Sequence, residues 1–150
     1  MTDVPSYRAP MRSRLDAVAP GAGTGRGLAR GLCGIGGRLD RSPLDLAEAV
    51  EATAQTYGER SAARLRRFAD VPDGAAVWTR DPDGRYFRGT LGGPWHYDGS
   101  SAAYEADLVH VRPCRWAEVE PPAVPEQVLE AFARGGRNFQ RIRTLDATQV

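Results

Sequence analysis

AAVWTRDPDGRYFRGTL, the stretch from residue 75 to residue 91, carries the clearest structural signal in the chain. Its side chains alternate in character on both sides of the tetrapeptide DPDG at residues 81–84, a pattern typical of two strands joined by a tight turn. Proline presets the backbone angle φ in such a turn, and glycine accepts a positive φ without steric cost. The sequence therefore predicts a β-hairpin with strands at residues 75–80 and 85–91.

Two helices are predicted upstream of this hairpin. Ser42 can cap the first, and Gly58 can end it. A second, shorter helix is expected after Ser61, with Leu65 and Phe68 directed inward. In the first helix, the residues that recur at helical spacing predict one face packed on a core; they are Leu46, Ala49, Val50, Thr53 and Tyr57.

The elements downstream of the hairpin complete the predicted fold. Residues 108–114 and 115–119 indicate one or two strands interrupted at Pro113, which a central strand tolerates only at a bulge. A helix at residues 126–134 and a short last strand at residues 138–143 follow. This order lacks the regular alternation of a doubly wound sheet. We therefore expect an α+β fold, with a small, curved, mostly antiparallel sheet or partial barrel and flanking helices.

The chain is expected to form one domain that follows a flexible arm. Residues 1–30 are rich in proline, glycine, alanine and arginine, and they show little apolar periodicity, so we predict a flexible basic arm. The stretch GAGTGRG at residues 21–27 matches neither the dinucleotide-binding nor the Walker pattern and reads as linker. Residues 31–150 would form the single domain, beginning with a short strand around Leu32, Cys33 and Ile35.

Composition narrows the functional classes. All 20 basic residues are arginines, while the formal net charge is only +1. Arginine binds phosphate in a planar, bidentate manner and stacks on flat rings, so the surface suits polyanions better than the net charge indicates. Cys33 and Cys114 do not form zinc-site spacing with the histidines and predict buried free thiols. With no membrane span and no secretory signal in the sequence, a cytoplasmic protein is expected.

No catalytic motif is recognisable in the sequence. His96 and His110 are the only histidines, and a lone histidine near aromatic residues is more often structural than catalytic. The stronger feature is Trp95 and Tyr97, which directly follow the kink GGP at residues 92–94. Such a pair suits a stacking wall for a planar ligand with an arginine nearby. It equally suits a lid that plugs the mouth of a curved sheet.

Six short motifs, in order, resemble the N-terminal domain of restriction-type, Mrr-like defence proteins. They are Gly34-Ile35-Gly36, Arg67-Phe68, Asp73-Gly74, the corner from Gly89 through Gly93-Pro94-Trp95-His96-Tyr97, the stretch His110-Val111-Arg112-Pro113-Cys114-Arg115-Trp116, and Phe139-Gln140-Arg141-Ile142. The series is also similar in layout to PUA-like and EVE-like domains. The resemblance implies a curved β-barrel that reads nucleic acid, in several cases through a flipped modified base, and does not cut it.

Together these observations lead to one main hypothesis. The chain is expected to be a non-enzymatic nucleic-acid-binding module, linked to phage defence, with a modified or flipped base in a pocket walled by Trp95, Tyr97 and Trp116. DNA is expected ahead of RNA, a separate effector protein is a possible partner, and no cofactor, metal or membrane is expected. The remaining base-binding candidates are Arg112, Arg115, His96 and Arg38. The phosphate-binding candidates are Arg60, Arg64, Arg66 and Arg67.

The sequence leaves open two other functions besides nucleic-acid binding. Trp95 and Tyr97 could instead form a protein-binding hot spot, which would suit the balanced net charge. An enzyme that uses His96 or His110 on a small molecule is the third reading.

Overall fold

The computed structural model describes residues 5–143, so the first four and last seven residues of the predicted arm and domain lie outside the described residues. In chain order the elements are β1 (Ser6–Arg8), α1 (Ala22–Arg30), β2 (Leu32–Ile35), α2 (Leu46–Tyr57), α3 (Glu59–Asp70), β3 (Ala76–Arg80), β4 (Tyr86–Leu91), β5 (His96–Tyr97), α4 (Ser101–Ala106), β6 (His110–Val119), the 3-10 turn η1 (Pro121–Ala123), α5 (Glu126–Ala133) and β7 (Gln140–Arg141).

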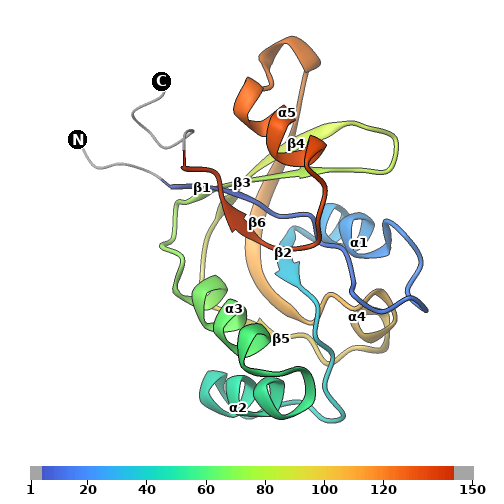
Figure 1. The fold of residues 1–150 in the computed structure, drawn as a ribbon, viewed down its shortest axis with the longest axis vertical. Helices are drawn as coiled ribbons and strands as arrows, with labels where there is room; N and C mark the ends of the chain where they lie inside the picture. The colour runs from blue at the N-terminus through green and yellow to red at the C-terminus, as the bar shows by residue number, and fades with distance from the viewer. Residues whose placement is uncertain (1–4, 144–150) are drawn as a thin grey trace.

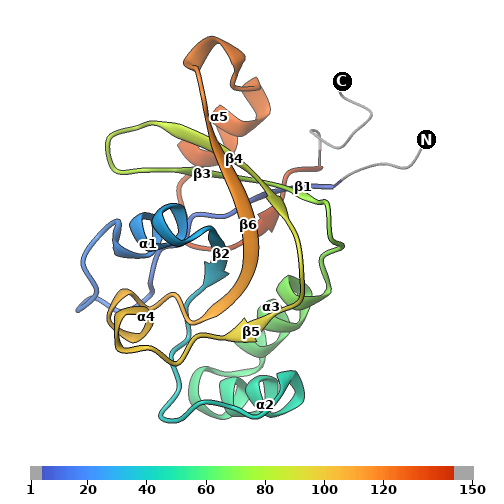
Figure 2. The ribbon, with the colours of Figure 1, turned by 180° about the vertical axis from the view of Figure 1, so that it is seen from behind.

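One curled sheet runs through the whole molecule. Its strands lie in the order β2-β6-β4-β3-β1-β7, and β5 also pairs with β6. Neighbouring strands are antiparallel, except that β1 and β3 are parallel. The sheet bends into a half barrel, with α2 and α3 at one end of the long axis and α5 at the other (Figure 1 and Figure 2). The prediction of an α+β fold with a small curved sheet and flanking helices is confirmed.

The predicted hairpin forms as β3 and β4, with Ala76 opposite Thr90 and Arg80 opposite Tyr86. Its partner β6 is one continuous strand, although Pro113 lies inside it. Cys114 donates its N–H to Gly31 on the β2 side at 2.9 Å, so the nitrogen of Pro113 faces the opposite side. There β4 has ended and β5 has not yet begun. The missing N–H therefore falls at a break in the ladder.

The two predicted helices are present, with corrections at both helix starts. Asp45 caps α2, because its carboxylate accepts the N–H of Glu48 at 2.9 Å, and Ser42 lies outside the helix. Gly58 ends α2 as predicted, but α3 begins at Glu59 and not after Ser61, and at 12 residues it is as long as α2. Leu65 and Phe68 of α3 are buried, as their spacing predicts.

The prediction of a flexible arm is wrong for residues 5–30. β1 pairs in parallel with β3, and Ala9 and Met11 belong to the main core. The glycine-rich stretch that reads as linker forms α1, a helix of nine residues. A Cβ on Gly27 would lie 2.8 Å from the carbonyl oxygen of Leu32, so its lack of a side chain permits this close packing. Tertiary contacts hold a helix that its composition disfavours.

Two apolar clusters stabilise the sheet. The larger one packs Phe68 and Val71, at the end of α3, against Val77 and Leu91 of the hairpin. The smaller one lies beneath α5 and centres on Trp78. Cys33 and Cys114 are both buried and free, as expected.

Candidate functional site

The kink at residues 92–94 turns the following aromatic residues toward the interior. Leu91 pairs with Cys114 and His96 pairs with Val111, so four residues of this strand, 92–95, face only residues 112 and 113 of β6. Gly93 adopts a φ of 88°, which only glycine accepts easily. The surplus residues form a bulge that places Trp95 against the main core cluster.

His110 is fully buried and is the centre of the aromatic group. The indole Nε1 of Trp95 donates to His110 Nδ1 at 3.2 Å, and Tyr97 meets the imidazole edge-on at a centroid distance of 5.4 Å. An indole N–H can only donate, so Nδ1 must be the acceptor and the proton resides on Nε2. That N–H donates to the carbonyl oxygen of Gly37 at 3.2 Å. Both ring nitrogens are therefore engaged within the protein.

Burial keeps this imidazole neutral. It lowers the pKa of His110 to about 4, and the Gly37 carbonyl and Asp107 only partly oppose the shift. At pH 7 the ring is uncharged. It has no free nitrogen and no charge with which to attract an anion, and it positions Trp95 and Gly37.

Arg112 is a structural residue of the core. It is only 2 % exposed. Its Nε donates to Gly93 at 3.0 Å, and Nη1 donates to Phe68 at 3.0 Å and to Val71 at 2.6 Å. Its Nη2 pairs with Asp73 at 2.8 Å. Arg112 thus fastens the end of α3 to the glycine kink and offers no donor to a pocket.

The other predicted base-binding residues are dispersed. Trp116 lies opposite Gly89 and donates its indole N–H to Leu32 at 2.9 Å. It is six residues along β6 from His110, roughly 20 Å at about 3.3 Å per strand residue. Tyr97 accepts the N–H of Leu39 through its hydroxyl at 3.0 Å. The structure therefore does not bring the three predicted pocket rings together, because Trp95 and Tyr97 both contact His110 while Trp116 packs farther along β6.

The three remaining candidates also lie away from any shared pocket. Arg38 stacks on Tyr104, with its guanidinium carbon 4.3 Å from the ring centroid. His96 and Arg115 are exposed on the strands β5 and β6. Their role in binding stays a prediction, and none of the three lines the cavity between β2 and the segment before β7.

That cavity lies where the half barrel remains open, between its two edge strands. Gly34 and Ile35 of β2 form one side, and Asn138 and Phe139, just before β7, form another. The cavity measures about 120 Å³. The rest of the lining comes from the segment after β1 (Pro10, Met11, Arg12, Arg14, Leu15), from the loop after β2 (Gly36, Gly37), from α2 and α3 (Thr53, Tyr57, Ser61, Arg64, Leu65), and from Asp107, His110 and Arg137.

Glycines allow the floor of the cavity to approach Asp107 closely. A Cβ on Gly36 would lie 2.6 Å from Asp107 Oδ2, so only glycine fits there. Asp107 Oδ1 accepts the N–H groups of Gly37 at 2.9 Å and Arg38 at 3.1 Å, and Oδ2 accepts the hydroxyl of Ser13 at 2.5 Å. The carboxylate of Asp107 thus links the loop after β2 to the segment after β1 through hydrogen bonds.

One buried polar atom of the lining has no partner. Thr53 is on the inner face of α2, and its hydroxyl oxygen is buried without a hydrogen bond. Tyr57, one turn later, has its hydroxyl satisfied by the carbonyl of Arg38 at 2.5 Å. Two rings hold Phe139 in place in the cavity wall. Its ring centroid lies 5.0 Å from that of Tyr7, on which it stacks, and 5.1 Å from that of Phe68, which it meets edge-on.

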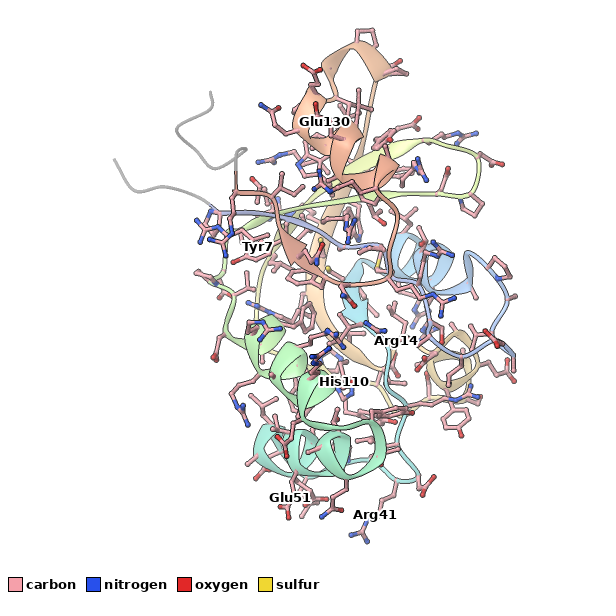
Figure 3. All side chains as sticks on the ribbon, viewed as in Figure 1. Tyr7, Arg14, Arg41, Glu51, His110 and Glu130 are labelled. Carbon is pink, nitrogen blue, oxygen red and sulfur yellow. The ribbon has the colours of Figure 1, made fainter. Side chains whose placement is uncertain are left out.

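The arginines Arg12, Arg14, Arg64 and Arg137 line the cavity. Arg64 lines it from α3, and its pKa is lowered by burial and then by the nearby charges of Arg14, Arg67 and Arg60. Arg60, Arg64 and Arg67 follow the i, i+4, i+7 spacing of one helix face. Figure 3 shows Arg14 near His110, beside α3. Arg14 donates to the side chain of Asn138.

The ion pairs within residues 5–143 join Arg26 to Asp98 and Arg112 to Asp73. No arginine of the cavity is therefore neutralised by a carboxylate in the described part of the chain. Of the four predicted phosphate-binding residues, Arg64 lines the cavity, and Arg60 and Arg67 lie near Arg64 on the same helix. Arg66 is exposed and outside the lining.

Sequence reasoning missed most of the lining. The helical stripe of arginines on α3 was visible in the spacing, and Thr53 and Tyr57 were recognised only as core positions. Arg12, Arg14 and Arg137 come from segments that meet α3 only through the pairing of β1 with β7, which no local pattern announces.

Residues 5–143 contain no helix long and apolar enough to cross a membrane. Within the same residues, no three His, Cys, Asp or Glu side chains gather as ligands for a metal ion. No protein-family model, curated protein or solved structure matches the chain.

Proposed function

We propose that this chain is a non-enzymatic nucleic-acid-binding module that takes a single flipped base into the cavity between its two sheet edges. The observation that carries the proposal is the ring of arginines Arg12, Arg14, Arg64 and Arg137 around a small apolar hollow, with no carboxylate paired to any of them within residues 5–143. Guanidinium groups bind phosphates in a planar, bidentate manner, so they suit the backbone on either side of an inserted base.

The size of the cavity supports a single planar ring. At about 120 Å³ it is close to the roughly 150 Å³ of a protein cavity that holds one benzene molecule. Phe139, Tyr57 and Ile35 supply apolar and aromatic lining. Flipping a base costs a few kcal/mol, and stacking on an aromatic side chain contributes about 1–3 kcal/mol, so a braced ring such as Phe139 offsets much of the cost.

The finer features of the proposal come from the family resemblance. A modified base as the preferred guest, DNA ahead of RNA, a separate effector protein, a role in defence and a cytoplasmic location all rest on that resemblance and on the buried free thiols. The protein-interaction alternative rests on Trp95 and Tyr97, which are half-buried, with Trp95 packed against the core and the hydroxyl of Tyr97 bonded to Leu39, and it stays a prediction.

A binding experiment with two matched variants tests the proposal. Fluorescence anisotropy would follow fluorescein-labelled single strands and duplexes, with and without one modified base, from about 50 to 200 mM salt. Arg64→Ala should weaken binding roughly tenfold and make the salt slope shallower by about one, the effect of one lost phosphate contact. Arg66→Ala, on the same helix but outside the cavity, should stay within about twofold of the wild type.

Two outcomes would overturn the proposal. One is the absence of binding of the wild type to every probe at low salt. The other is equal loss of affinity in the two arginine variants, because binding would then be a general surface effect. The indole of Trp95 donates to His110, which lines the cavity, so quenching of its fluorescence on binding would support insertion of a base.

A further inference from the structure

A second, shallower hollow adjoins the cavity at Arg12. We call it the α1 groove; its volume is about 260 Å³. Its lining combines the start of α1, the turn between β3 and β4, and the end of α5; its members besides Pro10 and Arg12 are Arg8, Pro20, Gly21, Thr24, Arg80, Asp81, Pro82, Gly84, Phe132, Gly135 and Gly136. Pro10 and Arg12 line both hollows, so the two hollows adjoin at the segment that follows β1.

Positive charge dominates the α1 groove. Arg8, Arg12 and Arg80 line it, against the single carboxylate of Asp81. That carboxylate is turned into its own β-turn, where Oδ1 accepts the N–H groups of Asp83 at 3.0 Å and Arg85 at 2.9 Å. Arg80 is exposed, with its guanidinium 5.8 Å from the centroid of Phe132, and no carboxylate pairs with it among the described residues.

Two further features of the groove favour an anion. α1 starts at its edge with Gly21 as N-cap, with no side-chain cap and no acidic residue in the first turn. The N–H groups and the dipole of a helix start attract phosphate oxygens. Independently, Arg8 is 4 % exposed and its Nε has no hydrogen-bond acceptor. Its two other nitrogens are held by Ala131 at 2.7 Å, Gly135 at 2.6 Å and Gln140 at 2.7 Å.

We infer that the α1 groove binds the phosphate next to the one held at the cavity, so that the natural ligand is an oligonucleotide of at least two linked nucleotides. This inference rests on the proposed function and specifies its ligand class. Arg12, at the junction, contacts the backbone between the two sites. A free base or a mononucleotide fills only the cavity and leaves Arg80 and the start of α1 without a ligand.

The test compares ligands of increasing length. Unlabelled deoxynucleoside monophosphate, dinucleotide and trinucleotide would compete with a fluorescein-labelled single strand of ten nucleotides. The wild type should bind the trinucleotide at least tenfold more tightly than the mononucleotide, because one more hydrogen-bonded phosphate is engaged. Backbone amide NMR signals of Gly23 and Thr24, in the first turn of α1, should shift with the trinucleotide and not with the mononucleotide.

Two variants of exposed arginines test whether the gain in affinity with ligand length comes from the α1 groove. Arg80→Ala should remove the gain with length and leave mononucleotide affinity within twofold, whereas Arg88→Ala, on the same hairpin but outside the groove, should retain the gain. Both side chains are exposed, so thermal unfolding should confirm that the two variants are folded. Equal affinity for all three lengths, or equal behaviour of the two variants, overturns this inference alone. Absence of binding to any probe, including the labelled strand, overturns the proposed function itself.

Discussion

Replacing Arg112 by alanine should be among the most destabilising single changes in this protein. The side chain is buried, and it satisfies carbonyl groups of Gly93, Phe68 and Val71. Phe68 retains a second partner, the N–H of Val71 at 3.4 Å, so two carbonyls lose the partner described for them. Leaving a buried polar group unsatisfied costs about 1–3 kcal/mol, so these two contribute roughly 2–6 kcal/mol.

The ion pair itself adds little to this cost. Arg112 is buried, but the side chain of Asp73 is 68 % exposed, so solvent screens their attraction and we assign the pair about 0–1 kcal/mol. The expected loss for Arg112→Ala is therefore roughly 3–5 kcal/mol, a large part of the 5–15 kcal/mol typical of a whole domain. Arg112→Met keeps the apolar stem and should cost nearly as much, because the carbonyls are what lose their partner.

Urea unfolding followed by circular dichroism would measure these differences. Arg115→Ala is the matched control, since this neighbouring arginine is exposed and should change stability by less than about 0.5 kcal/mol. Asp73→Ala should cost no more than about 1 kcal/mol. A loss below about 1 kcal/mol for Arg112→Ala, or a value equal to that of Arg115→Ala, would refute the assignment of Arg112 as the fastening between α3 and the kink.

Three further predictions concern the cavity and the core. The pKa of His110 is about 4 in the fold and 6.5 in the unfolded chain, so the unfolded state binds a proton first as the pH falls. The contribution of His110 to stability should be complete above pH 6.5 and should drop by roughly 3 kcal/mol by pH 4. The control variant His96→Gln should show this drop, and His110→Gln should not. Thr53→Val removes the unpartnered buried hydroxyl and should raise the free energy of unfolding by about 1 kcal/mol, whereas a decrease in melting temperature would mean that the hydroxyl has a partner. Gly36→Ala should destabilise by about 1–3 kcal/mol through its clash with Asp107, while Gly25→Ala, on α1 with open space around it, should stabilise by about 0.5–1 kcal/mol in calorimetry.

Local chemistry accounts for the part of the fold that sequence reasoning predicted. The turn at residues 81–84 specifies its own hairpin, and the spacing of Leu65 and Phe68 specifies the buried face of α3. The segment before residue 31 was misread, because α1 is stabilised by neighbours distant in the sequence and not by helix propensity. Its glycines indicate flexibility in isolation and close packing in the fold.

The site was harder to predict than the fold. Trp95 and Tyr97 follow a loop signal, so they were expected at a mouth, but the bulge turns Trp95 inward and the tyrosine hydroxyl is bonded to Leu39. Arg60, Arg64, Arg66 and Arg67 are recognisable as a cluster in the sequence, and their role in binding phosphate stays a prediction. Arg14 and Arg137, which line the cavity with Arg64, are separated by more than a hundred residues, and the pairing of β1 with β7 brings their segments together.

The wall of the cavity is formed by two segments far apart in the sequence, residues 10–15 and 137–139. A ligand bound there would contact both of these segments, which the pairing of β1 with β7 holds together. Loading the cavity should therefore slow fraying of these outer strands, and proteases should cut the occupied protein near either end more slowly than the empty one. Conversely, a bulky fusion that pulls β1 away from β7 would open the site while leaving the hairpin and α3 intact.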